Sequence, residues 1–374
     1  MNIKNIIENE GIKLNSDGAY LVGISPFSDS RLPLLVVDEE KQTFSDLSTG
    51  ICGDAVSFIE NLKGVSRETA ERMVRNEKPE QTEDEEARIL KNIMKDTNEY
   101  FKSKLTTSDT AKAYLNKRGF DEEDIKRYEF GYAPKFGSSL FKHLQKTYEK
   151  EMIIKSGVCK VDKEGKTVDL FWNRLMIPIR DTDGDIVAFG GRVLGDGTPK
   201  YINSPESPIF HKREMLYGYH IAKNVKCNAY IICEGYMDVL SLHKAGLTNA
   251  VASLGTALSK TQCELLTNKK RVYVLYDTDA AGVNASKKAI PMLEKLGLGT
   301  RVIDYSPAKD PDEFLKEFGL GEFRERFEDA EKGERYVVKK LIEEDIDKAV
   351  KYMSFMSINK IVGLMTRKEN ICIK

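Results

Sequence analysis

The chain has 374 residues, which is long enough for two or three domains with hydrophobic cores of their own. Its 58 basic and 59 acidic residues nearly cancel, so any binding of nucleic acid must depend on a local patch and not on a general positive field. The N-terminus lacks a secretory pattern and no apolar run is long enough to span a bilayer, so we expect a cytoplasmic protein.

The numbers and positions of the cysteines and histidines argue against a disulfide-bonded domain and against a zinc-binding domain. Six cysteines, at positions 52, 159, 227, 233, 263 and 372, are scattered without a Cys-x-x-Cys pair, and the chain has only four histidines. This spacing predicts neither a disulfide framework nor a zinc site. We therefore expect reduced thiols.

Residues 1–75 are typical of a small α+β domain. A short apolar strand is expected at 34–37, and a helix is expected from about Asp54. The side chains spaced for the buried face of that helix are Val56, Ile59 and Leu62. The acidic segment 76–92 follows, and we interpret it as a linker, although the exposed start of a helix explains its composition equally well.

Residues 93–227 begin with a helical pattern and then change period. Apolar residues alternate on either side of Asp183-Gly184, a pair that tolerates positive φ, so a β-hairpin is predicted there. The whole segment is interpreted as one subdomain of mixed α/β structure.

Strand and helix patterns alternate in residues 228–320, which predicts a parallel, doubly wound α/β sheet. The four expected strands are Ala229–Cys233, Asn249–Ser253, Val272–Tyr276 and Thr300–Asp304. The last segment, 321–374, is expected to be a charged helical tail without a strand.

Acidic residues follow the predicted strands. Glu234 ends the first, Asp277 and Asp279 end a later one, and Asp310 and Asp312 follow the next. If the chain is extended there, each i, i+2 pair faces one side, and ligands of open α/β sheets bind beyond the carboxyl ends of the strands. Five oxygen ligands without His or Cys favour Mg²⁺ or Mn²⁺ and suit phosphoryl chemistry. The alternative is that these residues are ordinary helix caps and turn acids.

The segments "EGYMDVLSLHKAGLTNAVASLGTALSKTQCELL", "VYVLYDTDAAG" and "KDPDEFL" closely resemble the Toprim region of bacterial-type DNA primases, in the order and spacing of that family. "RLMIPIRDTDGDIVAFGGRVL", "PKYINSPESPIFHKREMLYG", "AYLNKRGF" and "FGYAP" resemble the primase core that precedes it. The resemblance covers roughly 90–330. It implies that Glu234 is a metal ligand or general base, and that Asp277 and Asp279 are catalytic metal ligands. It also implies that Asp310 and Asp312 bind metal.

The resemblance also implies a basic ridge that contacts nucleotide and nucleic acid. Its candidate residues are Arg174, Arg192, Lys200, Tyr201, Asn203, Ser204 and Lys212. Composition alone favours a mixed solvated surface here. Gly190-Gly191 would permit close approach of a phosphate, or could mark a bulge or a tight strand crossing.

The N-terminal unit resembles the primase zinc-ribbon domain, with one departure. The four ligand positions hold Ser25, Ser28, Asp46 and Thr49, and Cys52 falls at a family glycine. Hydroxyls are poor tetrahedral zinc ligands, so we expect a degenerate zinc-ribbon-like domain without zinc. Its core is then expected to pack through Phe27, Phe44, Phe58 and Leu62.

Three functions remain open at this stage. The first is metal-dependent synthesis of short RNA primers from nucleoside triphosphates on single-stranded DNA, with replication proteins as expected partners. The second is an accessory nucleic-acid-binding protein that keeps a primase core but cannot initiate alone. The third is a Toprim nuclease. Because only a charged tail follows the α/β unit, we expect no helicase docking by the usual C-terminal domain.

Overall fold

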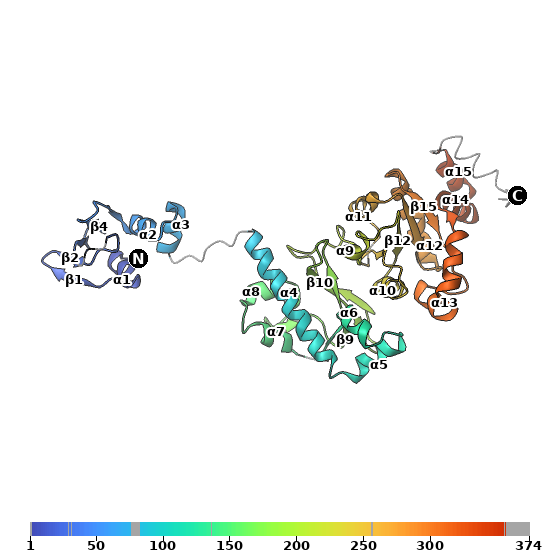
Figure 1. Ribbon diagram of the computed structural model, residues 1–374, viewed down its shortest axis with the longest axis horizontal. Coiled ribbons are helices and arrows are strands. Elements are labelled where there is room, and N and C mark those ends of the chain that lie inside the picture. Colours follow the sequence, from blue (N-terminus) through green and yellow to red (C-terminus); the bar gives the residue numbers. More distant parts are fainter. Residues whose placement is uncertain are drawn as a thin grey trace. The chain divides into compact units, whose positions relative to one another are not determined.

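The structure is a computed structural model that describes residues 2–28, 30, 32–75, 83–135, 137–255, 257–354 and 356. The chain divides into two compact units, residues 1–85 and 86–374 (Figure 1). Each has its own hydrophobic core.

The first unit is a five-stranded antiparallel sheet, in the order β1-β2-β3-β4-β5, with three helices. Its elements are α1 (Ile3–Asn9), β1 (Leu14–Asp17), β2 (Tyr20–Gly23), β3 (Leu35–Asp38), β4 (Thr43–Asp46), β5 (Cys52–Asp54), α2 (Ala55–Lys63) and α3 (Arg67–Val74). Asp54 caps α2, because its carboxylate accepts a hydrogen bond from the Ser57 N–H at 2.8 Å. The rings of Phe27, Phe44 and Phe58 pack together with centroids 5.1–5.9 Å apart.

A buried carboxylate holds the turn that follows β4. Asp46 is 1% exposed, and its Oδ1 accepts hydrogen bonds from the N–H groups of Ser48 at 3.0 Å and Thr49 at 2.8 Å, and from both hydroxyls. Burial opposes ionisation of Asp46, but hydrogen bonds from Ser25, Ser48 and Thr49 outweigh it and lower the pKa to about 2. The ionised form is therefore favoured by folding. This contribution to stability is complete above about pH 4 and is lost as the pH falls toward 2.

The second unit begins with helices around a four-stranded antiparallel sheet, in the order β11-β10-β9-β6. Its elements are α4 (Glu83–Leu105), α5 (Asp109–Lys117), α6 (Glu122–Arg127), β6 (Gly131–Ala133), α7 (Ser139–Leu144), α8 (Lys150–Lys155), β7 (Cys159–Val161), β8 (Thr167–Asp169), β9 (Arg174–Arg180), β10 (Ile186–Val193) and β11 (Tyr201–Asn203). Gly184 has φ +95° in the β9–β10 hairpin, at the predicted turn. Residues 83–92 are helical, so the predicted linker 76–92 extends too far; residues 76–82 lie outside the described residues.

The rest of the second unit is built on a five-stranded sheet, in the order β13-β12-β14-β15-β16. Its elements are α9 (Tyr219–Ala222), β12 (Ala229–Cys233), α10 (Tyr236–Lys244), β13 (Ala250–Ala252), α11 (Lys260–Leu265), a 3₁₀ turn (Leu266–Asn268), β14 (Arg271–Leu275), α12 (Ala280–Lys295), β15 (Gly299–Val302), α13 (Pro311–Glu328), β16 (Glu331–Lys332), α14 (Gly333–Glu344) and α15 (Ile346–Met353). The first four strands are parallel, as predicted. The tail differs from the prediction, because β16 adds a short antiparallel strand beside β15.

Helices cover both faces of this sheet (Figure 1), and β12 shows why its sequence is apolar throughout. Tyr230 and Ile232 belong to one hydrophobic cluster, which includes residues of α11, α12 and α14. Ile231 and Cys233 belong to another, which includes residues of α10, α13 and the β9–β10 hairpin. The four-stranded and the five-stranded sheets of the second unit therefore share the second of these clusters. None of the described helices combines the length and apolarity that crossing a membrane requires.

We predict that Asp46→Ala accelerates amide exchange across residues 35–54, because two N–H groups lose a charged acceptor, a loss of about 1–3 kcal/mol. Hydrogen–deuterium exchange of the full chain, read by mass spectrometry, measures this locally. Ser45→Ala, at an exposed position of the same strand, is the matched control and should leave exchange unchanged. Unchanged protection in Asp46→Ala would show that the network does not stabilise the turn.

Candidate functional site

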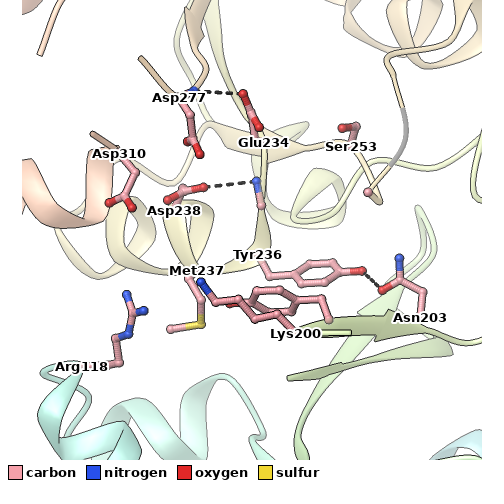
Figure 2. A pocket seen from close by; sticks show the side chains of 13 residues that line it. Arg118, Lys200, Asn203, Glu234, Tyr236, Met237, Asp238, Ser253, Asp277 and Asp310 are labelled. Carbon is pink, nitrogen blue, oxygen red and sulfur yellow. Dashed lines mark hydrogen bonds between the residues drawn. The ribbon is translucent and has the colours of Figure 1, made fainter. Parts of the chain in front are cut away.

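A pocket of ≈230 Å³ opens at the carboxyl ends of β12 and β14 in the second unit (Figure 2). Its lining residues come from both parts of the second unit and are Arg118, Lys200, Tyr201, Asn203, Glu234, Gly235, Tyr236, Met237, Asp238, Ser253, Gly255, Asp277 and Asp310. Four carboxylates lie on one side of it, and Arg118 and Lys200 lie on the other.

Glu234 follows β12 directly, and local geometry fixes its carboxylate. Its Oε1 accepts a hydrogen bond from the N–H of Asp277 at 3.0 Å, which joins the ends of two neighbouring strands. A Cβ at Gly282 would lie 2.6 Å from the same oxygen and 2.0 Å from the Asp277 carbonyl oxygen. The glycine of the Asp-x-Asp-x-x-Gly motif is therefore required for α12 to start this close to the two acids.

The carboxylates repel one another. Burial and the charges of Glu234, Asp310 and Asp279 raise the pKa of Asp277 to about 7, although Lys309 opposes the shift. Burial raises the pKa of Glu234. The hydrogen bond from the Asp277 N–H lowers this pKa, and the charge of Asp279 raises it further, so the net shift is upward. The site stores electrostatic repulsion that a bound cation would relieve.

Asp238 is a fourth pocket acid that the sequence analysis missed. It lies in the first turn of α10, where its Oδ2 accepts a hydrogen bond from the Gly235 N–H at 3.2 Å. Burial and the charges of Asp310, Asp277 and Asp312 raise its pKa well above the usual range. Its place three residues after Gly235 was the available signal, because an acid at the third position of a helix can accept a hydrogen bond from the N–H of the N-cap residue.

Two of the five predicted acids do not line the pocket. Asp279 is exposed and caps α12, where its Oδ1 accepts hydrogen bonds from the Ala281 and Gly282 N–H groups at 2.9 Å. Asp312 is buried beside the pocket and pairs with Arg118 and Lys316. The prediction assumed extended chain, but Asp310 caps α13 and Asp312 lies in its first turn, so the two side chains diverge.

The predicted basic residues divide into two groups. Lys200, Tyr201 and Asn203 line the pocket. Arg192 lies with its guanidinium carbon 4.3 Å from the centre of the Tyr114 ring and 5.7 Å from that of Tyr201, so it buttresses the pocket wall.

The others serve the fold or lie elsewhere. Arg174 is buried and donates to the carbonyl oxygens of Gly191 and Pro199, both at 3.0 Å. Ser204 is buried, and its hydroxyl oxygen accepts a hydrogen bond from the Phe189 N–H at 3.0 Å. Lys212 does not line the pocket. Arg118, at the C-cap of α5, lines the pocket although the sequence analysis did not select it.

Side chains, and not a phosphate, occupy the space beside Gly190-Gly191. A Cβ at Gly190 would lie 2.8 Å from the Tyr236 ring, and one at Gly191 would lie 2.8 Å from the Phe171 ring. The two glycines let these rings pack against β10. The Tyr236 hydroxyl reaches Asn203, so this contact joins α10 to β11 at the pocket (Figure 2).

A second pocket, of ≈760 Å³, lies on the other side of β11. Ile202 lines it, whereas Tyr201 lines the acidic pocket, and Asn203 lines both. Trp172, the single tryptophan of the chain, is 54% exposed at its wall, together with the exposed Lys135 and Lys160. An exposed indole with lysines nearby is suited to stacking on a nucleic-acid base.

The donor set of the acidic pocket fits a hard divalent cation. Its acidic side chains offer only oxygen atoms, and burial together with the charges of neighbouring acids raises the pKa of Glu234, Asp238 and Asp277. Among the described residues, however, no three His, Cys, Asp or Glu side chains already stand close enough to hold one metal ion.

Three family models match the chain. Residues 100–223 match the DNA primase catalytic core, N-terminal domain; residues 231–315 match the Toprim-like model; and residues 1–88 match the CHC2 zinc finger. Curated relatives are DNA primases. That of Halalkalibacterium halodurans is 35% identical over 334 residues, and that of Clostridium acetobutylicum is 32% identical over 368 residues.

This chain belongs to the bacterial-type DNA primase family. It covers 55% of the H. halodurans primase and 62% of the C. acetobutylicum primase, while 84% and 94% of the chain are matched. A crystal structure of the Aquifex aeolicus primase, described as its zinc-binding and RNA polymerase domains, matches 97% of the chain and 93% of its own, with a TM-score of 0.65 and 31% identity. A primase catalytic domain bound to ssDNA matches 74% of this chain and 90% of its own, with a TM-score of 0.65 and 32% identity.

The comparisons contradict the prediction that no zinc is expected. The match of residues 1–88 to the CHC2 zinc finger, and the zinc-binding domain named for the Aquifex structure, both point to zinc. The side chains at the four family positions supply oxygens: the Ser28 hydroxyl lies 2.8 Å from that of Ser48, and Asp46 accepts the hydrogen bonds described above. This set does not fit a tetrahedral Cys/His site.

With divalent cations chelated, Asp277→Asn should raise the melting temperature, because it removes a carboxylate that its neighbours repel. The folded pKa of about 7 lies above the ordinary value of 3.8, so the parent loses stability as the pH rises from about 4 to 7. The gap between variant and parent should widen over that range. Melting curves measure it, with about 2–4 °C expected for each kcal/mol of relieved repulsion.

Two comparisons make this measurement specific. Asp183→Asn, at the exposed hairpin turn, should melt like the parent at every pH. Adding Mn²⁺ should stabilise the parent more than Asp277→Asn. An Asp277→Asn protein that melts below its parent at pH 8 under chelation would contradict the repulsion.

Proposed function

We propose that this protein synthesises short RNA primers from nucleoside triphosphates on a single-stranded DNA template. The observation that carries the proposal is the pocket at the carboxyl edge of the parallel sheet, where Glu234, Asp238, Asp277 and Asp310 face Arg118 and Lys200. The family relationship supports it. The arrangement provides oxygen ligands for a divalent cation and positive side chains for the phosphates of a nucleotide.

In the proposed reaction, the oxygen of a primer 3′-hydroxyl forms a bond to the α-phosphorus of a nucleoside triphosphate. The bond from that phosphorus to the bridging oxygen of the β-phosphate breaks, and pyrophosphate leaves. Asp277 and Asp310 are the candidate ligands for Mg²⁺ or Mn²⁺, with Asp279 at the exposed rim. When bound, the cation supplies Lewis-acid stabilisation of charge on the phosphate oxygens.

Glu234 is the candidate acceptor for the hydroxyl proton. Burial and the charge of Asp279 raise its pKa, which makes it a stronger base than an exposed glutamate. The Asp277 N–H holds one of its oxygens, so the carboxylate has a fixed orientation. Metal ligation by Glu234 is the alternative role, and it uses the same oxygen atoms.

Arg118 and Lys200 are the candidate contacts for the triphosphate. An arginine provides a planar fork of N–H donors, whereas a lysine provides a compact charge. Tyr201 lines the same wall, and the guanidinium carbon of Arg192 lies 5.7 Å from the centre of its ring. The basic ridge expected from the sequence is in this proposal confined to the few residues that face the acids.

The template strand is proposed to pass over β11 into the second pocket. Asn203 lines both pockets, so a strand that leaves the acidic pocket can continue toward Trp172. Lys135 and Lys160 lie within the same lining and provide charges for its phosphates.

Incubating the protein with single-stranded DNA, labelled nucleoside triphosphates and Mg²⁺ or Mn²⁺ should yield short RNA products. Asp277→Ala should abolish them, a loss of at least 100-fold, because the pocket loses a central carboxylate. Asp183→Ala is the matched control and should retain full synthesis. Absence of product on every template would favour an accessory role, and degradation of the DNA without nucleotides would favour a nuclease.

Trp172→Ala should weaken binding of single-stranded DNA by about 5- to 100-fold, since stacking of one base contributes about 1–3 kcal/mol. Fluorescence anisotropy of a labelled oligonucleotide measures the affinity. Trp172→Phe keeps an aromatic face and should recover most of it. If Trp172→Ala binds as tightly as the parent, the proposed template path is wrong.

A further inference from the structure

Asp312 has all the features of a residue that holds another side chain in place. It is 2% exposed, and both of its carboxylate oxygens have partners. Oδ2 accepts from Arg118 and from Lys316, the latter at 2.5 Å, and Oδ1 accepts from the Ser241 hydroxyl. Two cations therefore already neutralise this carboxylate.

The Arg118–Asp312 pair spans the second unit. Arg118 ends α5, in the part built on the antiparallel sheet, and Asp312 lies in the first turn of α13, beside the parallel sheet. Lys244 of α10 makes a second bridge, since it donates to the Gly119 carbonyl oxygen and to Asp124. The segment 118–124 is thus held at two points by helices of the parallel-sheet part.

The pair also fixes where Arg118 stands. Arg118 lines the acidic pocket, whereas Asp312 does not, although Asp310, two residues before it, does. A guanidinium carries five N–H groups, and the hydrogen bond to Asp312 occupies one of them. An arginine that is anchored in this way presents its remaining donors in a fixed direction, which lowers the entropy lost when a phosphate binds.

We propose that Asp312 is a positioning residue that holds Arg118 at the edge of the pocket for contact with the phosphates of a nucleoside triphosphate, and that it is not a metal ligand. The proposal rests on the proposed function for the identity of the nucleotide. It assigns different roles to two aspartates of one motif: Asp310 faces the cation site, and Asp312 faces an arginine.

The test compares Asp312→Asn with Asp310→Asn by two equilibrium measurements on the full chain. Calorimetric titration with Mn²⁺ alone should show that Asp312→Asn keeps its affinity within about 2-fold, while Asp310→Asn loses at least 10-fold. Titration with a non-hydrolysable nucleoside triphosphate in the presence of Mn²⁺ should show that Asp312→Asn weakens nucleotide binding about 10- to 100-fold, because the guanidinium is misplaced.

Matched variants separate positioning from general damage. Lys316→Gln removes the other cation from the same carboxylate and should leave nucleotide affinity unchanged. When Arg118→Gln is already present, adding Asp312→Asn should weaken nucleotide binding by less than about 3-fold, because the residue that Asp312 positions is gone. In the primer-synthesis assay, Asp312→Asn should raise KM for the nucleotide far more than it lowers kcat.

Three results would overturn the proposal: loss of Mn²⁺ affinity in Asp312→Asn equal to that in Asp310→Asn, unchanged nucleotide affinity in Asp312→Asn, or independent losses in the double variant. If Asp312→Asn does not fold, Ser241→Ala replaces it. That variant frees the other carboxylate oxygen and must weaken nucleotide binding about 2- to 5-fold without changing Mn²⁺ affinity. Because binding is measured apart from synthesis, a protein that makes no primers would refute the proposed function and still test Asp312.

Discussion

The mutual repulsion of carboxylates at the end of a buried sheet is the constraint on which the site depends. The strands β12 and β14 are covered on both faces, so their carboxyl ends are where charged side chains can reach a ligand. Placing Glu234, Asp277, Asp238 and Asp310 there costs stability, as the raised pKa values of the first three show. The burial of apolar strands and helices on either side of the site offsets this loss of stability and holds the backbone in place.

The acids alone do not make the pocket, since its opposite wall belongs to another sheet. Tyr236 packs over Gly190, and its hydroxyl reaches Asn203, so α10 and the edge of the antiparallel sheet meet at the site. One hydrophobic cluster continues beneath both parts of the second unit. A nucleotide in the pocket would therefore contact acids from one sheet and cations from the other, and their spacing is set by a common core.

The sequence predicted the parallel sheet well, because its strands are continuous apolar runs separated by helical patterns. All four strands lie within two residues of their expected bounds. It selected Glu234 and Asp277 because each follows an apolar run, and Asp310 because it belongs to the segment after the next strand; all three line the pocket. It could not place Asp312, because the i, i+2 rule holds for extended chain and here a helix begins at Asp310.

The roles of other residues could not be predicted from the sequence for a different reason. Arg118 comes close to the acids only through packing between elements that are 194 residues apart, and no local pattern carries that information. Arg174 and Ser204 belong to the segment that resembles a basic ridge, yet burial turns them toward backbone groups. A polar side chain serves the fold if its hydrogen-bond partners lie within the protein, and it can serve a ligand if it faces a pocket. Which of the two holds is determined by the tertiary structure.

The charges around the pocket also bear on whether a cation and a nucleotide would favour each other's binding there. A triphosphate is strongly anionic, and four acids that repel one another would repel it as well. Arg118 and Lys200 offset only part of that charge, and Arg118 already pairs with Asp312, whose carboxylate also binds Lys316. A bound divalent cation would relieve both kinds of repulsion, so in the proposed reaction its binding would favour that of the nucleotide and, by linkage, the nucleotide would favour the cation. The destabilised acids would thus couple the two ligands, which a site with paired, neutralised carboxylates would not do.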